Sequence, residues 1–452
     1  MSIQRYSIVG ASPSAISAVG GTNLSEKPLI GVVFAHLTDE QAKKLAGIPG
    51  VNVKVVGKVS TSVRVPTPVP ASAFLSLSPE VMIEQSELDK FRKSWGPIPL
   101  YGQGVTVAVV DTGVRTTHSS LGGKVVYSEN FSSSPTTDDV FNHGTGVAHI
   151  IHAMAPEANI LNMRIIGDDG ECTEEQVVNA IERCVEMKVQ GHQYAPVLIN
   201  LSVGAEDSGN PNDVMRVACR VATMEYNLWI VAAAGNNGPN PGTIDCPACE
   251  QYVMAVGSCS LPDYVVNDFS SRGPTKEGLI KPDILMPGND VLVASSASDV
   301  ATIAKSGTSF AAPFVTSIGI WFKQGVKIYT EPSAYIIAAA PYFRIYAVNI
   351  DPTMVDVIDH YMPIGGIKPG DVLTATHLST KDNDYGYGTM FAPLAVEYLT
   401  AGLESDIKSL VGLDIGAMIN MFMPIIVLGM VANFTRSMLK ASSKKKVGLK
   451  YT

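Results

Sequence analysis

Short apolar runs alternate with amphipathic stretches through the middle of the chain. The runs have the length and composition of buried strands and are Val105–Val110, Val197–Leu201, Leu228–Ala234 and Tyr252–Val256. Residues 173 to 188 have the spacing of a helix, with an apolar face formed by Val177, Ala180, Ile181, Cys184 and Val185. Continuously apolar strands separated by helices predict an α/β fold with a mostly parallel sheet flanked by helices.

Residues 27–59 show the pattern of a smaller α+β unit. Leu29 to Val33 is apolar enough for a strand. Thr38 and Gln41 have capping-box spacing, which predicts that a helix begins there. Residues 51–55, with valine at every second position, predict another strand. A unit of this size buries little surface by itself, so we expect it to pack on a larger domain.

The segments on either side of this unit are poor in regular pattern. Residues 1–26 are predicted to be an N-terminal leader, but Arg5 is followed by a Ser-, Gly- and Ala-rich stretch that makes no clear signal peptide. Residues 60–90 contain Pro66, Pro68 and Pro70, which favour an extended linker. The larger domain is predicted to span residues 91–400.

An uncharged apolar stretch near the end of the chain predicts a membrane-spanning helix. Residues 415–435 carry no charge and are long enough to cross a bilayer. They follow a juxtamembrane segment, 401–414, and precede a basic tail, 436–452. By the positive-inside rule the tail is cytoplasmic and the larger domain extracytoplasmic. The alternative is a buried or interfacial helix of a soluble protein.

Composition limits the classes of function. The net charge is −9, and setting aside the six positive charges of the tail leaves −15 for the other 435 residues. Such an acidic body argues against nucleic acid as a partner, whereas the basic tail suits membrane lipid. Six cysteines in 452 residues exclude a small disulfide scaffold.

Three local motifs carry residues suited to nucleophilic catalysis. Asp111 ends an apolar strand, and the carboxyl ends of parallel strands are where ligands gather. His143 lies in the sequence Asn-His-Gly-Thr-Gly at the start of an apolar helix. Ser309 lies where a glycine turn leads into a small-residue helix, in Gly-Thr-Ser-Phe-Ala-Ala-Pro. Asp, His and Ser in this order form one of the known orders of the serine-hydrolase triad.

With these motifs the chain resembles the subtilisin-like serine proteases, the subtilase family. Residues 199–204, 231–236, 269–274 and 385–388 resemble further motifs of that family in the same order, over about residues 90 to 400. The resemblance implies a serine endopeptidase in which Ser309 attacks the peptide carbonyl, His143 is the base and Asp111 orients it. It also implies that Asn236 donates to the oxyanion.

The resemblance also implies a peptide-binding cleft and a zymogen. Gly167 and Gly170 would belong to an edge strand that pairs with substrate. The other predicted cleft residues are Ser202, Val203, Gly204, Ala233, Ala234 and Gly235. Residues 27–59 resemble the inhibitory propeptide of the family, which implies that the chain inhibits and then cleaves itself within about residues 60 to 90. Catalysis requires no cofactor, and the family commonly binds structural calcium.

Several readings stay open at this stage. A catalytically inactive subtilisin fold that serves as a binding module, or an acyl-transfer variant that ligates or cyclises peptides, would have the same motifs. His149 and His152 are three apart on a helix, which suits packing better than a metal site because no carboxylate or thiol shares the spacing. Cys246 and Cys249 would form a local disulfide or remain free thiols.

Overall fold

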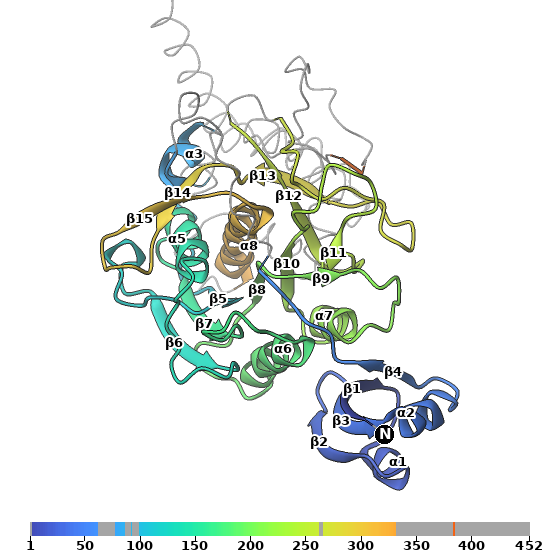
Figure 1. Ribbon diagram of the computed structural model, residues 1–452. Helices are drawn as coiled ribbons and strands as arrows, with labels where there is room; N and C mark the ends of the chain where they lie inside the picture. Colours follow the sequence, from blue (N-terminus) through green and yellow to red (C-terminus); the bar gives the residue numbers. More distant parts are fainter. Residues whose placement is uncertain are drawn as a thin grey trace, which may run out of the picture.

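Two folded units follow one another along the chain in the computed structural model (Figure 1). The structure describes residues 2–61, 77–85, 92, 99–261, 265–330 and 383–384. The predicted membrane span 415–435, its flanking segments and the motif at 385–388 lie outside the described residues. Among the residues that are described, none of the helices is both long and apolar enough to cross a membrane.

The N-terminal unit is a four-stranded antiparallel sheet with two short helices. Its elements are β1 (Ile3–Val9), α1 (Pro13–Ala18), β2 (Thr22–Lys27), β3 (Val32–Thr38), α2 (Asp39–Ala46) and β4 (Asn52–Val55). The strand order is β2-β3-β1-β4. Thr38 and Gln41 form the predicted capping box at the start of α2. Ala42 and Leu45 on α2 join Ile8 and Leu37 in a small core of their own.

The unit begins earlier in the chain than the sequence predicted. Residues 1–26 were expected to be a leader, but β1 pairs with both β3 and β4 and so lies inside the sheet. Tyr6 and Ile8 alternate with polar residues and point into the core, a two-residue period that the Ser- and Gly-rich surroundings obscured. The predicted strand at Leu29–Val33 is likewise displaced, because the chain turns at Lys27–Ile30 before β3 begins.

The larger unit is built on a seven-stranded sheet with the order β13-β12-β10-β8-β5-β7-β6. Every neighbouring pair in it is parallel, as predicted. The strands are β5 (Thr106–Asp111), β6 (Val125–Asn130), β7 (Asn159–Arg164), β8 (Leu198–Leu201), β10 (Trp229–Ala233), β12 (Met254–Cys259) and β13 (Ile284–Pro287). Each predicted apolar run overlaps one of these strands, and β5 and β12 extend beyond the end of their runs.

Helices cover both faces of this sheet (Figure 1). They are α5 (Gly144–Met154), α6 (Glu174–Val189), α7 (Val214–Met224) and α8 (Thr308–Thr330). On the central strand β5, Val107 and Val109 join the core formed with α5 and α8, whereas Ala108 and Val110 join the core formed with α6 and α7. A strand buried on both faces has no polar side, which explains the continuous apolar runs.

Shorter elements surround the sheet. They are η1 (Ser119–Leu121), α3 (Pro79–Gln85), β9 (Ala205–Glu206) paired with β11 (Asp245–Cys246), and β14 (Val291–Ala294) paired with β15 (Thr302–Lys305). Helix α3 corrects the expectation of a featureless linker over residues 60–90. Met82 and Ile83 are buried in the core beside α5, and two apolar side chains were too weak a signal to predict this contact.

The N-terminal unit packs against the α6 and α7 side of the larger unit. Ile30, Val32 and Phe34 are buried in the same core as those helices. Arg5 lies 2.6 Å from Glu175, and Lys54 lies 2.7 Å from Glu174 and 2.6 Å from Asp213. In Figure 1 the blue trace that leaves β4 then runs toward the centre of the larger unit. The small unit therefore rests on a larger partner, as its size predicted.

Candidate active site

Asp111 and His143 form a buried pair at the carboxyl end of β5. Asp111 is the last residue of β5 and His143 precedes α5, and neither is more than 1% exposed. Asp111 Oδ1 lies 2.6 Å from His143 Nδ1 and also accepts a hydrogen bond from the Thr112 N–H, at 2.7 Å. A carboxylate at Nδ1 holds the proton on that nitrogen, which leaves Nε2 as an acceptor. His143 Nε2 is buried and has no hydrogen-bond partner.

Gly144 permits this close approach. A Cβ atom at position 144 would lie 2.2 Å from the Gly113 carbonyl oxygen and 3.1 Å from Asp111 Cβ. Any side chain there would push the start of α5 away from the end of β5. The glycine after His143 is therefore a geometric requirement of the pair.

Asp139 organises the same loop, and the sequence analysis did not identify it. Its Oδ2 accepts hydrogen bonds from the backbone N–H groups of His143 and Thr145, both at 3.0 Å. Its Oδ1 accepts from the Thr112 hydroxyl at 2.9 Å, and Thr112 in turn accepts from the Gly144 N–H. A carboxylate at a helix N-terminus satisfies N–H groups that the helix leaves unpaired. The available signal was an acidic residue four positions before His143.

Ser309 lies in the first turn of α8, beside this pair. The edge of the Phe310 ring faces His143, with ring centroids 5.2 Å apart. The Ser309 hydroxyl donates to the Ser202 carbonyl at 3.1 Å, and the Ser202 hydroxyl donates to the Ser309 carbonyl at 2.9 Å. The structure thus brings the start of α8 next to His143, but the Ser309 hydroxyl is bonded to Ser202 and not to the imidazole.

Asn236 is held against the start of α8 by its carbonyl oxygen. Asn236 Oδ1 accepts hydrogen bonds from the Thr308 N–H at 2.9 Å and from the Thr308 hydroxyl at 3.0 Å. The Thr308 hydroxyl also lies 3.2 Å from both the N–H and the carbonyl of Gly235. These contacts orient the Asn236 side chain beside the N–H groups of the first turn of α8, where partial positive charge accumulates.

The predicted cleft residues follow two neighbouring parallel strands, β8 and β10, on the same edge of the sheet. Ser202 contacts Ser309, as described above. Val203, Ala233 and Ala234 are buried. Gly204 forms two hydrogen bonds with Ser60, from N–H to carbonyl in each direction and both at 3.0 Å.

That contact belongs to a segment of the chain itself, residues 57–61, which lies along the cleft. Val59 donates its N–H to the Cys172 carbonyl at 2.9 Å, and Lys58 pairs with Thr173 in an antiparallel bridge. Val59 is 3% exposed and packs into the core beside α6. An extended peptide thus lies between the segment after β7 and the segment after β8, which is the geometry of β-strand addition.

The pairing with this segment differs from the predicted one. Gly167 and Gly170 were expected to form the edge strand, but they close a turn in which the Gly170 N–H donates to the Gly167 carbonyl at 2.9 Å. The strand-like contacts begin two residues after Gly170, at Cys172. Sequence alone did not reveal where the turn ends and the extended backbone begins.

A cavity of about 560 Å³ adjoins Asn236. Both parts of the cleft contribute to its wall, Gly204 from one strand end and Asn236 from the other. Its remaining lining residues are Ser60, Thr61, Ala205, Glu206, Asp207, Asn237, Gly242, Thr243, Ile244, Asp245 and Lys276.

His149 and His152 do not share a ligand. His149 Nδ1 accepts the Ala294 N–H at 3.0 Å, and its Nε2 lies 3.6 Å from Glu80. Burial lowers the pKa of His152. Within the described residues no cluster of three or more His, Cys, Asp or Glu side chains is placed to hold a metal ion. The contacts with Ala294 and Glu80 account for how His149 is held in the fold.

All six cysteines are free and buried. Cys246 and Cys249 are therefore not joined, and the Cys246 thiol contacts Asp213 Oδ1 at 3.8 Å. Burial raises the pKa of the Cys172 thiol to about 12. Buried thiols of this kind are unreactive, and they contribute to the core as small apolar groups.

Comparison with known families gives one extended match. The profile of the Subtilase family (peptidase S8) matches residues 102–388. The matched range contains Asp111, His143, Asn236 and Ser309.

Two relatives and one solved structure illustrate the similarity. Serine protease AprX of Bacillus subtilis is 30% identical over 251 residues, which are 48% of this chain and 57% of AprX. Subtilisin-like protease 4 of Trichophyton rubrum is 29% identical over 224 residues, 49% of this chain and 52% of that protein. The chain thus spans just over half the length of these relatives. The prenylagaramide maturation protease PagA superposes with a TM-score of 0.50 at 23% identity, over 68% of this chain and 98% of PagA.

Proposed function

The chain belongs to the subtilase family, and on that premise we propose that it is a serine endopeptidase that hydrolyses peptide bonds through an acyl-enzyme on Ser309. One observation carries the proposal. Asp111 and His143 are 2.6 Å apart and buried, and the Nε2 atom that would accept the serine proton has no hydrogen-bond partner. Such an imidazole, beside the helix that bears Ser309, is poised as a general base.

Each group has a defined part in the proposed reaction. The Ser309 hydroxyl leaves its bond to Ser202, transfers its proton to His143 Nε2 and attacks the peptide carbonyl. Asp111 stabilises the imidazolium that forms. The imidazolium then donates its proton to the leaving amine, and water hydrolyses the acyl-enzyme by the same route in reverse.

The oxyanion requires donors that are already in place. The Asn236 amide is turned so that its oxygen faces Thr308, which supports a role for its N–H₂ group toward the substrate. The N–H of Ser309, at the positive end of α8, is the second donor in this proposal.

A fluorophosphonate probe that reacts with activated serines tests the nucleophile. We expect wild-type protein that has lost its N-terminal unit to be labelled and Ser309→Ala to remain unlabelled, while Ser202→Ala, which removes the Ser202 hydroxyl, retains labelling. Labelling that persists in Ser309→Ala would refute the assignment. No labelling of the wild type after its N-terminal unit has been removed would favour an inactive binding module, and ligated or cyclised products in mass spectra of a model peptide would favour acyl transfer.

We further propose that the N-terminal unit inhibits the enzyme until the chain cuts itself. The support is that residues 57–61 lie in the cleft and pair with Cys172 and Gly204, where a substrate would bind. Because the folded N-terminal unit starts at Ile3, we propose an inhibitory unit of about residues 3–61 in place of 27–59. N-terminal sequencing of the mature protein should give a start after Thr61 and before about residue 91. A start before Leu29, or a chain that is never processed, would contradict this proposal.

We also propose that residues 415–435 anchor the enzyme in a membrane with the protease domain outside. The support is the sequence alone, an uncharged stretch followed by six basic residues. The full chain should remain with membranes after alkaline carbonate washing, whereas a chain ending at Asp414 should be released. Release of both forms would disprove the anchor.

A further inference from the structure

The cavity beside Asn236 is acidic. Its lining contains three carboxylates, Glu206, Asp207 and Asp245, and one ammonium, that of Lys276. Lys276 lies 3.0 Å from Glu206, whose side chain is exposed, so that pair is neutral overall. The other two carboxylates, Asp207 and Asp245, are buried, at 4% and 7% exposed.

Asp245 is the carboxylate nearest to the proposed chemistry. A Cβ atom added at Gly235, the residue before Asn236, would lie 2.5 Å from Asp245 Oδ2. One added at Gly204, on the opposite strand end, would lie 3.0 Å from Asp245 Cβ. Asp245 Oδ1 accepts a hydrogen bond from the Asn237 side chain at 3.1 Å, which fixes the carboxylate orientation. Asp245 therefore lies between the two strand ends that form the cleft.

A peptide already lies at the mouth of this cavity. Ser60 and Thr61 belong to its lining, and Ser60 pairs with Gly204. A substrate that binds in the antiparallel register of Ser60 would place its residue two positions further on opposite Ser202, the residue bonded to Ser309. The carbonyl of that substrate residue would then lie near Ser309 and Asn236, and its side chain would enter the cavity between Gly204 and Asn236.

We propose that this cavity binds an arginine or lysine side chain of the substrate, at the residue immediately before the cleaved bond, with Asp245 as its counter-ion. The inference rests on the proposed function and extends it to substrate class. A buried carboxylate in a pocket wall favours a cationic ligand and disfavours an acidic one, because each charge gains most where water is excluded. The volume of about 560 Å³ exceeds what a small apolar side chain would fill.

The linker supplies an internal case. Between Thr61 and Pro79 the sequence contains a single basic residue, Arg64. In the register in which Ser60 pairs with Gly204, Arg64 is two residues too far along the chain for cleavage after it. Cleavage there requires the segment to shift by two residues, and such a shift keeps the same set of side chains facing the cleft. The proposal therefore predicts a mature chain that begins at Val65. A mature chain that begins elsewhere in this linker would contradict it.

A panel of chromogenic peptides tests the pocket directly. The peptides differ only in the residue before the leaving group, which is arginine, lysine, norleucine or glutamate. We expect kcat/KM for arginine and lysine to exceed that for norleucine, a neutral analogue of lysine, by about 10²-fold or more, and glutamate to be cleaved least. Equal or faster cleavage of the norleucine peptide would overturn the proposal.

Two substitutions assign the effect to one carboxylate. Asp245→Asn should lower kcat/KM for the arginine peptide by about 10²-fold and change it little for norleucine. Glu157→Gln is the matched control and should stay within about threefold of wild type, because Glu157 lies outside the cavity lining and forms an exposed pair with Lys124. Asp245→Glu, which keeps the charge, should retain part of the preference even if Asp245→Asn folds poorly.

Labelling of Ser309 separates the two levels of the argument. If the fluorophosphonate probe labels the enzyme and the norleucine peptide is the better substrate, the proposed serine protease is retained and the basic pocket is contradicted. If the probe fails to label wild-type enzyme whose N-terminal unit has been removed, the proposed function itself is contradicted. An unchanged preference in a folded, labelled Asp245→Asn variant would overturn the role of Asp245.

Discussion

At the scale of single residues, one carboxylate determines the protonation of the proposed base. Asp111 Oδ1 faces His143 Nδ1 at 2.6 Å, so the ring keeps its proton on that side and presents Nε2 as an acceptor. The surrounding groups are arranged for this purpose. Asp139 fixes the backbone of His143, and the glycine at 144 allows the two elements to meet.

Replacing Asp111 by Asn tests this electrostatic role without changing the shape of the side chain. An amide that donates to Nδ1 would move the ring proton to Nε2, where it blocks transfer from Ser309. We expect kcat to fall by about 10⁴-fold with little change in KM, as in other serine proteases with this arrangement. The thermal unfolding temperature serves as the folding control. A loss smaller than about tenfold would mean that another group orients His143.

The buried cysteines give a second prediction at this scale. All six thiols are buried, and burial raises the pKa of Cys172 to about 12, so thiolate is scarce near pH 8. In Ser309→Ala, chosen to prevent self-digestion, a disulfide reagent should titrate fewer than one thiol in the native protein and six in denaturant. Two missing thiols in denaturant would indicate a disulfide, with Cys246 and Cys249 as the pair to examine first.

At the scale of elements, helix α3 illustrates how a short amphipathic segment is recruited to a core. Met82 and Ile83 pack beside α5, and Glu80 reaches His149 on α5 with 3.6 Å between Oε1 and Nε2. Chiefly through this contact with His149, the pKa of Glu80 falls to about 2. The contact therefore joins α3 to α5, the helix that follows His143.

The depressed pKa of Glu80 makes this contact dependent on pH. A carboxyl group whose pKa is lower in the folded protein stabilises it above the ordinary value of 4.5, and that stabilisation is lost as the pH falls toward 2. Because Glu80 is more than half exposed, we expect a contribution of under about 1 kcal/mol. Urea unfolding of Ser309→Ala with and without Glu80→Gln should differ at pH 6, differ less at pH 3 and converge near pH 2. A difference that does not shrink between pH 6 and pH 2 would exclude the charge as its source.

The elements also show what could be predicted from the sequence. The parallel sheet was predictable because strands buried on both faces leave long apolar runs, and helix α2 because its cap is local to Thr38 and Gln41. Strand β1 was not, since its alternation is short and its partners are distant in sequence. The candidate catalytic residues Asp111, His143 and Ser309 could be identified from motifs, whereas the contacts of Asp139 and Asp245 exist only in the fold.

At the scale of the whole molecule, ion pairs attach the N-terminal unit to the larger one. Lys54 lies within 2.7 Å of Glu174 and Asp213, two carboxylates whose side chains are 2% exposed. Partial burial opposes the charge of Lys54, but hydrogen bonds to Asp213 and Glu174 outweigh it and raise its pKa. The attachment combines these charges with the apolar contacts of Val32 and Phe34.

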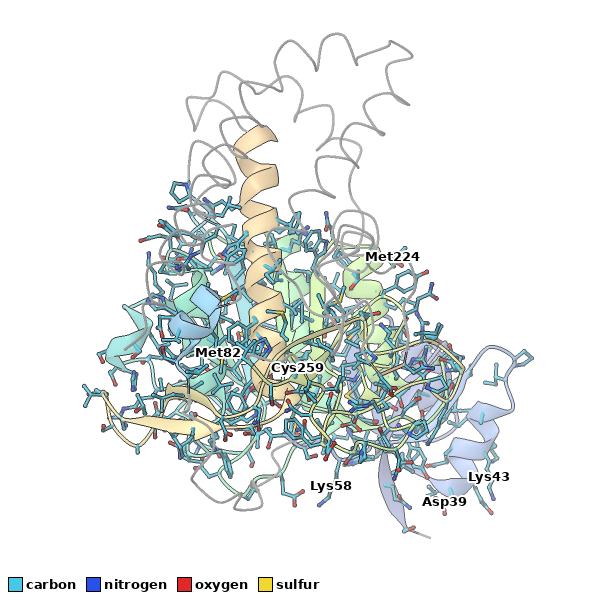
Figure 2. The ribbon with its side chains drawn as sticks, turned by 90° about the horizontal axis from the view of Figure 1, so that it is seen from above. Asp39, Lys43, Lys58, Met82, Met224 and Cys259 are labelled. Atoms are coloured by element: carbon cyan, nitrogen blue, oxygen red, sulfur yellow. The ribbon has the colours of Figure 1, made fainter. Side chains whose placement is uncertain are left out.

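Lys54→Met should weaken this attachment by leaving two buried carboxylates without their cation. We expect the cleaved N-terminal unit to dissociate with a Kd about 10- to 100-fold higher than in wild type, measured as loss of co-elution on size exclusion. Lys43→Met is the control. Lys43 lies on α2, at the side of the small unit that faces away from the larger unit (Figure 2). Equal weakening by both substitutions would show that the ion pairs are not specific.

Under the proposed self-processing, the segment that lies in the cleft has a consequence for the time course of activity. Cutting the linker does not by itself empty the cleft, because Ser60 still pairs with Gly204 and the ion pairs still attach the unit. Each molecule that does lose its N-terminal unit becomes able to digest the units bound to its neighbours. Activity in a population should therefore rise after a lag and accelerate as free enzyme accumulates. The rise should depend steeply on enzyme concentration. Dilute enzyme should remain inactive, whereas the molecules of a concentrated sample should become active within a short interval of one another.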